Sequence, residues 1–222
     1  MRNIIKRSLT GAGLVTLVVF SILGGPVSFF ILVLLIYFLS ARELLIMNKQ
    51  RPDFFPVLLT LSGAGAICLA FMGIKYKLDP LWLGLPALTW LIAAMNPSTR
   101  NSALLLLFWI TLPLSSLLIL GWSGGKEGYS ALLPLSLIII IWINDTFAYL
   151  TGIMFGKHSL APKISPKKSV EVSIGGLGFA IVAAYIISIY SPELNMVVWL
   201  LIALIIALFG TLGDLAESML KR

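Results

Sequence analysis

The hydrophobic residues of this chain lie in long runs that are interrupted by glycine, proline and charged residues. A helix needs about 20 mainly apolar residues to cross a bilayer. By this measure the pattern predicts an all-α, polytopic integral membrane protein with about eight transmembrane helices. The predicted helices cover residues 9–24, 27–47, 54–74, 79–96, 101–121, 131–155, 173–191 and 195–212.

The first of these runs follows Arg2, Lys6 and Arg7, an arrangement that also opens secretory signal peptides. Small residues occur near Gly24, but no clear cleavage site of the small-x-small kind is present. We therefore favour a first helix that is retained in the membrane.

Composition strengthens the membrane interpretation. The 222 residues are 59% hydrophobic and only 11% charged, whereas soluble domains are about 25% charged. A single cysteine, Cys68, allows no intrachain disulfide and is expected to serve helix packing. The net charge of +7 does not indicate nucleic acid binding, because basic residues of membrane proteins orient the helices and attract anionic lipids.

The basic residues are distributed unevenly between the two sides of the predicted topology. With the N-terminus in the cytoplasm, thirteen of the 16 Lys and Arg residues lie on the cytoplasmic side and three, Lys75, Lys77 and Lys126, lie outside. This bias predicts a multi-pass protein of the cytoplasmic membrane. No linker or repeat interrupts the chain, so we expect one transmembrane domain, 1–222, with N-terminal spans in 1–130 and catalytic-type spans in 131–222, including a cytoplasmic loop at 156–172.

One carboxylate lies inside a predicted helix rather than at its end. Asp145 precedes the end of the run 131–155 by about ten residues, which is roughly 15 Å along a helix. A carboxylate at that depth is costly unless it faces a wet cavity, a cation or a partner, so such residues usually mark functional sites. Tyr149, four residues later, shares its face of the helix.

Further polar residues gather near the cytoplasmic ends of the last three predicted helices. Asp214 follows Gly213 at the end of the last run, and Glu171 opens the run before it. The loop 156–172 carries four lysines, and prolines stiffen it. Lysines and hydroxyls bind phosphate oxygens, and oxygen ligands alone favour a hard cation such as Mg²⁺. This combination indicates phosphoryl or nucleotidyl transfer to a lipid phosphate.

At these residues the chain resembles the phosphatidate cytidylyltransferase (CDP-diacylglycerol synthase) family. The resemblance rests on residues 142–149 (WINDTFAY), 155–158 (FGKH), 160–169 (LAPKISPKKS) and 213–215 (GDL). It implies transfer of CMP from CTP to phosphatidate, which gives CDP-diacylglycerol and pyrophosphate in phospholipid biosynthesis, with Mg²⁺ or another divalent cation.

The resemblance also implies roles for individual residues. Asp145 and Asp214 are expected to be metal ligands and, with Lys167 and Lys168, catalytic residues. The residues expected to bind the nucleotide or its phosphates are Asn144, Lys163, Ser165, Ser169 and Lys221.

The chain departs from the family pattern in two respects. Val172 replaces a glycine of the basic loop, which is a mild change. Beyond Lys221, the family continues with a Lys-Asp pair, a His-Gly-Gly turn, an Asp-Arg-x-Asp segment and one more helix. We therefore expect a truncated chain that lacks part of the site, with an activity that must be measured directly.

Two other functions are compatible with the sequence. A CTP-dependent polyprenol or phytol kinase would use similar groups, and a cation or proton transporter would use Asp145 as its carrier site. CTP, phosphatidate and the bilayer are the expected partners, nucleic acid is not, and a homodimer is left open.

Overall fold

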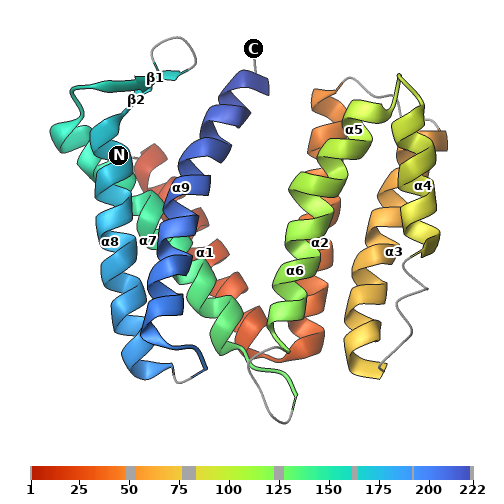
Figure 1. Ribbon diagram of the computed structural model, residues 1–222, viewed down its shortest axis with the longest axis horizontal. Helices are drawn as coiled ribbons and strands as arrows, with labels where there is room; N and C mark the ends of the chain where they lie inside the picture. Colours follow the sequence, from red (N-terminus) through yellow and green to blue (C-terminus); the bar gives the residue numbers. More distant parts are fainter. Residues whose placement is uncertain are drawn as a thin grey trace. The chain divides into compact units, whose positions relative to one another are not determined.

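The computed structural model describes residues 2–48, 54–76, 84–122, 128–161, 165–191 and 193–220 (Figure 1). The chain divides into two compact units, Met1–Pro134 and Leu135–Arg222. Each unit is described by itself below.

The described part of the N-terminal unit consists of helices. Gly25 makes the turn between the first two, and its φ of 111° lies in the left-handed region that favours glycine. Pro26 then begins the second helix, where its missing N–H costs nothing. The helices are α1 (Arg2–Leu23), α2 (Pro26–Met47), α3 (Phe54–Tyr76), α4 (Gly84–Met95), α5 (Arg100–Leu105), the π-helical turn η2 (Leu106–Thr111) and α6 (Leu112–Leu120).

The segments α5, η2 and α6 form one apolar span, Arg100–Leu120. Within it, the hydroxyl of Thr111 donates a hydrogen bond to the carbonyl of Leu106 at 3.0 Å. Pro113 follows in the next turn and has no N–H to continue the ladder. A π-turn at this place accommodates the break and widens the helix locally.

The core of the N-terminal unit is centred on α2. Tyr37 is fully buried, and its hydroxyl donates a hydrogen bond to the carbonyl of Thr60 on α3 at 2.9 Å. Gly63, on the same helix, leaves the space that the phenol occupies, because a Cβ there would overlap the Tyr37 hydroxyl. A glycine thus allows α3 to pack closely against α2.

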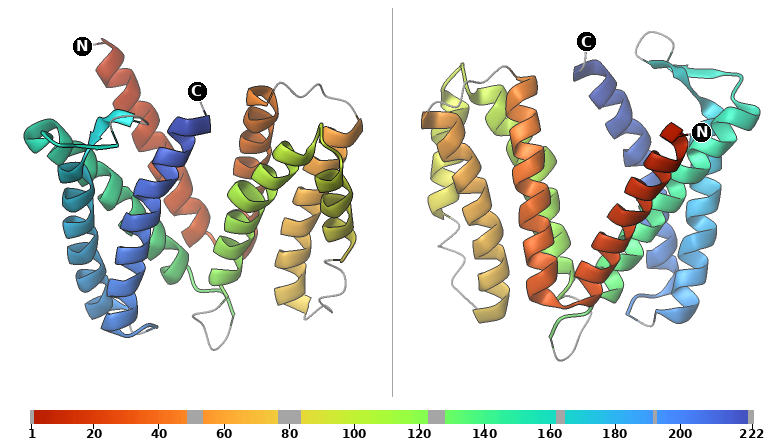
Figure 2. Two further views of the ribbon diagram at one scale, coloured as in Figure 1. Left: turned by 45° about the horizontal axis from the view of Figure 1, so that its top comes forward. Right: turned by 180° about the vertical axis from the view of Figure 1, so that it is seen from behind.

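The C-terminal unit combines three long helices with a short β-hairpin (Figure 2). Helix α7 (Leu132–Phe155) begins just before the boundary between the units and continues into this one. The strands β1 (Ser159–Ala161) and β2 (Ser165–Ser169) pair antiparallel, with Ser159 opposite Ser169. Helices α8 (Val170–Tyr190) and α9 (Met196–Leu220) lie side by side.

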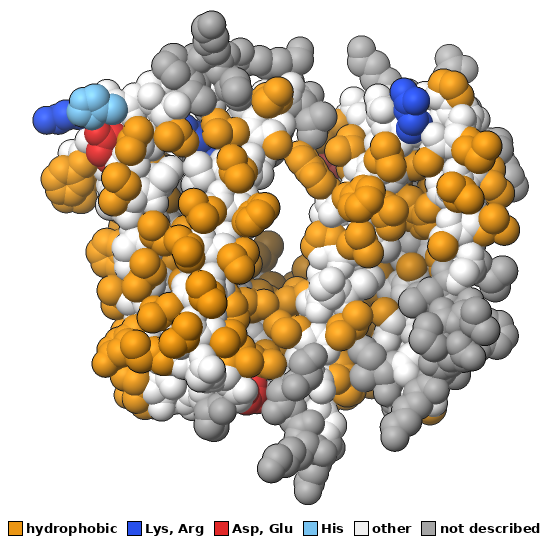
Figure 3. Space-filling view, in the orientation of Figure 1, with side chains coloured by type: hydrophobic (Ala, Val, Ile, Leu, Met, Phe, Trp, Pro, Cys, Tyr) orange, Lys and Arg blue, Asp and Glu red, His pale blue; other side chains and the backbone are white. Residues whose placement is uncertain are grey.

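The predicted fold class is confirmed. The described residues of all eight predicted segments are helical for most of their length, and six helical segments among them are long and apolar enough to cross a membrane. The two others contain the shorter apolar helices Leu9–Leu23 and Pro86–Met95. Hydrophobic side chains cover the sides of the helices, as expected for surfaces that face lipid (Figure 3). The assignment of 1–222 to a single domain stays a prediction.

Candidate active site

Small residues bring α7 and α8 close together beside the predicted acidic residue. A Cβ added to Gly176 of α8 would lie 2.8 Å from the side-chain oxygen of Asn144 and 3.0 Å from its carbonyl oxygen. A Cβ on Gly152 would lie 2.6 Å from Val172. The two helices therefore approach closely over more than two turns, because glycine stands at the contact points.

Asn144 lies where three helices meet. It is only 7% exposed, since Gly176 of α8 covers one side of it. On the other side, a Cβ on Gly210 of α9 would lie 3.7 Å from the Asn144 amide nitrogen. This amide donates a hydrogen bond to Oδ1 of Asp145 at 3.1 Å. The buried asparagine thereby orients the acidic side chain that follows it.

A pocket of about 340 Å³ opens beside Asn144 within the C-terminal unit. We call it the polar pocket. Its walls come from α7, β2, α8 and α9, and its lining residues are Asn144, Asp145, Ala148, Tyr149, Lys168, Val172, Ser173, Gly210, Thr211 and Asp214.

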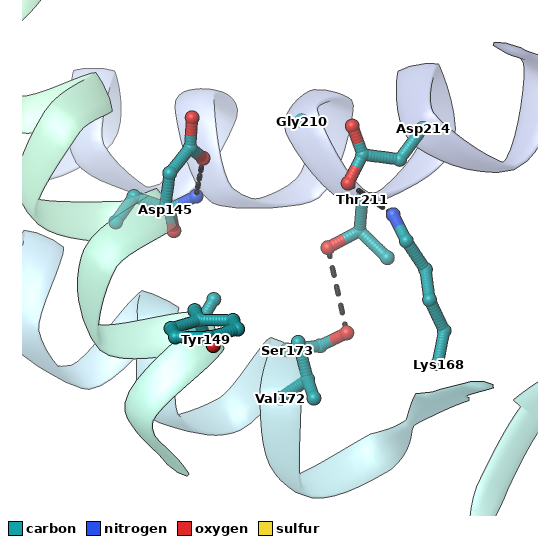
Figure 4. Close-up of a pocket in the computed structure, with 10 residues that line it drawn as sticks. Asp145, Tyr149, Lys168, Val172, Ser173, Gly210, Thr211 and Asp214 are labelled. Atoms are coloured by element: carbon teal, nitrogen blue, oxygen red, sulfur yellow. Dashed lines mark hydrogen bonds and ion pairs between the residues drawn. The ribbon is translucent and has the colours of Figure 1, made fainter. Parts of the chain in front are cut away.

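Two carboxylates and one ammonium group line the polar pocket (Figure 4). Asp145 comes from α7 and Asp214 from α9, so residues 69 positions apart in the sequence reach one cavity. Lys168, at the end of the hairpin, donates a hydrogen bond to Oδ2 of Asp214 and forms an ion pair with it. Asp145 has its amide partner but no ion pair among the described residues.

Hydroxyl groups add to the polar lining. The hydroxyls of Thr211 on α9 and Ser173 on α8 lie 3.4 Å apart (Figure 4). Thr211 is also within hydrogen-bond distance, 3.0 Å, of the carbonyl of Ala207 one turn earlier. The pocket therefore presents carboxylate, hydroxyl and amide oxygens together with one lysine.

The hairpin that carries Lys168 is held at its base by Glu171. One carboxylate oxygen of Glu171 accepts hydrogen bonds from the backbone N–H groups of Lys157 and His158, each at 3.3 Å. The other lies 2.7 Å from Nδ1 of His158. The N–H of Val170 also donates to the carbonyl of His158 at 2.9 Å. Glu171 thus joins the end of α7 to the start of α8, in addition to its favourable position at a helix N-terminus.

Four of the residues predicted for the site lie together in the polar pocket. They are Asn144, Asp145, Lys168 and Asp214. These residues come together because the helices pack closely. In the sequence, only the glycines indicate this packing.

The other predicted residues either do not line the polar pocket or lie outside the residues that the structure describes. Ser165 and Ser169 are not among the described lining residues. Ser169 is 8% exposed, and its hydroxyl has no hydrogen-bond partner in the described part of the chain. Lys163 and Lys221 lie outside the described residues, as does the side chain of Lys167.

Ser173 and Thr211 are pocket residues that the sequence did not single out. A signal for Thr211 exists, because it lies three residues before Asp214 and therefore on the same helical face. Ser173 had no comparable signal, since its place in the pocket depends on how α8 faces α9.

The donor set of the polar pocket suits a hard divalent cation. Its oxygens are the ligand type that Mg²⁺ prefers, and Mg²⁺ is commonly bound through one or two carboxylates while water and substrate phosphates complete its shell. No group of three or more His, Cys, Asp or Glu side chains able to hold a metal occurs among the described residues. The described residues thus fit a cation that is shared with a phosphate.

Comparisons with known proteins point to one family. The sequence profile of the cytidylyltransferase family matches residues 5–222. A phosphatidate cytidylyltransferase of Staphylococcus aureus (strain COL) is 50% identical over 86 residues, which cover 38% of this chain and 33% of that protein. Proteins of the same name from Staphylococcus saprophyticus and Staphylococcus epidermidis are 43% and 41% identical over 86 residues. The match thus spans about a third of the length of each of these relatives.

Proposed function

The chain belongs to the cytidylyltransferase family, and we propose that it transfers CMP from CTP to phosphatidate, giving CDP-diacylglycerol and pyrophosphate. The family assignment makes it an enzyme of the membrane. The choice of nucleotide and lipid is the proposal, supported by the names of the relatives.

The observation that carries this proposal is the polar pocket itself. Two carboxylates, Asp145 and Asp214, and the ammonium of Lys168 meet in one pocket of a unit whose long helices are mainly apolar. Charged groups in such helices are costly and serve a site. A phosphate-rich substrate that arrives with a cation would match both signs of charge in this pocket.

The reaction needs no nucleophile from the protein. An oxygen of the lipid phosphate attacks the α-phosphorus of CTP and forms the new P–O bond. The bond from the α-phosphorus to the oxygen that bridges to the β-phosphorus breaks, and pyrophosphate leaves with the electron pair. Positioning and charge neutralisation supply most of the catalysis in such transfers.

Individual residues of the polar pocket have separate roles in this reaction. Lys168 contacts phosphate oxygens and offsets their charge. Asn144 holds Asp145 in one orientation through its amide. Ser173 and Thr211 place hydroxyl groups at the wall formed by α8 and α9.

A divalent cation such as Mg²⁺ belongs to the proposal as cofactor, with Asp145 and Asp214 as its protein ligands. When bound, it would offset the charge of the nucleotide phosphates and make the α-phosphorus more electrophilic. Asp214 reaches this role only if Lys168 releases it, because the two form an ion pair in the structure.

The remaining residues of the basic segment are proposed phosphate contacts. Lys163, Lys167, Ser165 and Ser169 flank Lys168 in the sequence, and Lys221 follows α9. This concentration of basic and hydroxyl residues in the sequence would hold a nucleotide that carries several negative charges.

We also propose that the N-terminus and the hairpin face the cytoplasm, where CTP is available. The thirteen-to-three distribution of basic residues supports this orientation.

Membranes that contain the chain should convert CTP and phosphatidate into CDP-diacylglycerol when a divalent cation is present. CTP labelled at the α-phosphorus should pass its label to the lipid, whereas CTP labelled at the γ-phosphorus should not. A polyprenol or phytol that takes up γ-label would establish the kinase instead. Absence of any lipid labelling, together with ion uptake that depends on Asp145, would establish the transporter.

A further inference from the structure

Tyr149 is the one aromatic residue among the described residues that line the polar pocket. It stands one turn after Asp145 on the same face of α7, and it is 68% exposed. Neither its ring nor its hydroxyl has a partner among the described residues. By contrast, Phe147 is stacked on Phe179 of α8, with ring centroids 3.7 Å apart. Tyr149 therefore presents an unpartnered aromatic ring to the pocket.

Apolar side chains of the pocket lie beside Tyr149. Ala148 precedes it on α7, and Val172 comes from α8. Val172 packs at the level of Gly152, three residues after Tyr149, because a Cβ on Gly152 would lie 2.6 Å from a methyl group of Val172. Ligand sites commonly combine an apolar surface of this kind with a few polar groups that orient the ligand. This part of the pocket suits a flat ring rather than a phosphate.

The charged groups leave this ring available when a nucleotide is bound. Figure 4 shows Asp145 and Tyr149 on one side of the polar pocket and Lys168 with Asp214 on the other. Under the proposed function, Lys168 and the cation hold the phosphates. The base of the nucleotide then needs a surface of its own, and an aromatic side chain binds the flat face of a base by stacking.

The position of Tyr149 along α7 favours the nucleotide over the lipid. The helix ends at Phe155, and the polar hairpin follows. Tyr149 lies six residues before this end, roughly 9 Å along the helix, whereas Asp145 lies ten residues before it, roughly 15 Å. Tyr149 is thus on the side of Asp145 that is nearer to the membrane surface. The acyl chains of a phosphatidate extend in the other direction, toward the centre of the bilayer.

We propose that Tyr149 holds the cytosine of CTP by stacking its ring on the base, with Ala148 and Val172 beside the stack. The inference rests on the proposed function and adds the residue that contacts the base. Stacking does not read the hydrogen-bonding edge of a base. Tyr149 therefore raises the affinity for the nucleotide without selecting one pyrimidine over another.

Binding of two ligands to the solubilised full chain tests this inference. CTP and inorganic tripolyphosphate both carry three linked phosphates, but only CTP has a base. In titration calorimetry with Mg²⁺ present, Tyr149→Leu should bind CTP about tenfold or more weakly, as is typical when a stacking aromatic residue is lost. Its affinity for tripolyphosphate should equal that of the wild type, which also shows that the pocket is folded.

Two further variants serve as controls. Tyr149→Phe keeps the ring and should bind both ligands as the wild type does. Tyr185→Leu makes the same change on α8, at a residue that is not among the described lining residues, and should alter neither affinity.

Three outcomes would overturn the inference. They are unchanged CTP binding in Tyr149→Leu, equal weakening of CTP and tripolyphosphate in that variant, or a wild type that binds CTP no more tightly than tripolyphosphate. The last comparison does not require any variant to fold. Failure of the proposed function is seen in a different measurement, as absence of the α-label from the lipid, and these titrations do not depend on transfer.

Discussion

Lys168 and Asp214 are paired across the polar pocket, one from the end of the hairpin and the other from α9. Their side chains are 22% and 61% exposed, so water screens the pair, and an ion pair of this kind contributes about 0–1 kcal/mol. A weak pair is suited to exchange its partners. A phosphate can replace Asp214 at Lys168, and a cation can replace Lys168 at Asp214.

This exchange predicts opposite effects of Lys168→Gln on two ligands. Without its competitor, Asp214 should bind Mn²⁺ about 2- to 5-fold more tightly, as the weak pair implies. CTP should bind about tenfold or more weakly, because a hydrogen bond to a charged group is lost. Both constants can be measured by titration calorimetry of the solubilised chain. Lys157→Gln removes the same charge outside the polar pocket and should change neither.

Asp145→Asn should reduce formation of CDP-diacylglycerol by about 100-fold or more, as is typical when a group that stabilises charge in the transition state is removed. The amide keeps the size of the side chain, so the thermal unfolding temperature should stay close to that of the wild type. Glu193 lies in the connection between α8 and α9, at the ends of these helices that are far from the polar pocket. Glu193→Gln should therefore retain activity. Full activity of Asp145→Asn would remove this residue from the mechanism.

Gly176→Ala should destabilise the C-terminal unit by about 1–3 kcal/mol, the usual cost of overpacking. The new Cβ would lie 3.0 Å from the Asn144 carbonyl oxygen, a backbone atom that cannot rotate away. Gly178→Ala, half a turn later on the same helix, meets nothing within 4 Å and should stabilise the helix by up to about 1 kcal/mol. Thermal melting of the two variants in one detergent compares them directly, and equal melting temperatures would contradict the close contact.

Glu171→Ala should loosen the base of the hairpin. The carboxylate accepts the backbone N–H groups of Lys157 and His158, so both amides should exchange faster with deuterium in the variant. Mass spectrometry of the peptide that contains them gives the rate. Glu193→Ala should leave that peptide unchanged, and unchanged exchange in Glu171→Ala would show that these hydrogen bonds are not formed in solution.

The orientation can be tested with single cysteines, because Cys68 is the only one in the chain. In a Cys68→Ser background, His158→Cys should react with a membrane-impermeant maleimide only after the cells are permeabilised. Ser130→Cys, which lies before α7, should react in intact cells. The reverse pattern would place the polar pocket on the outer side.

The sequence predicted the helices well, because the bilayer imposes a minimum length on every apolar run. Asp145 illustrates this success: its place ten residues before the end of α7 at Phe155 follows from counting alone. The hairpin was not predicted. Its strands have three and five residues, which is too short for an alternating pattern to show, and the lysines and prolines of the segment indicate a loop.

The sequence predicted the charged residues of the polar pocket, but not the hydroxyl residues that line its walls. Asp145 and Asp214 stand out in the sequence because charge is rare in this chain. Ser173 and Thr211 do not, since hydroxyl residues are common in membrane helices and often bond to their own backbone, as Thr211 does with Ala207.

The order in which the chain is synthesised has a consequence for the polar pocket. Its walls come from α7, β2, α8 and α9, and Asp214 lies near the end of α9. The ribosome delivers this aspartate after all the other described pocket residues, so Asp145 and Lys168 are synthesised before the wall that Asp214 completes. Domains generally fold in the order of synthesis. The polar pocket is therefore incomplete in every nascent chain until α9 is in place and packs against α8.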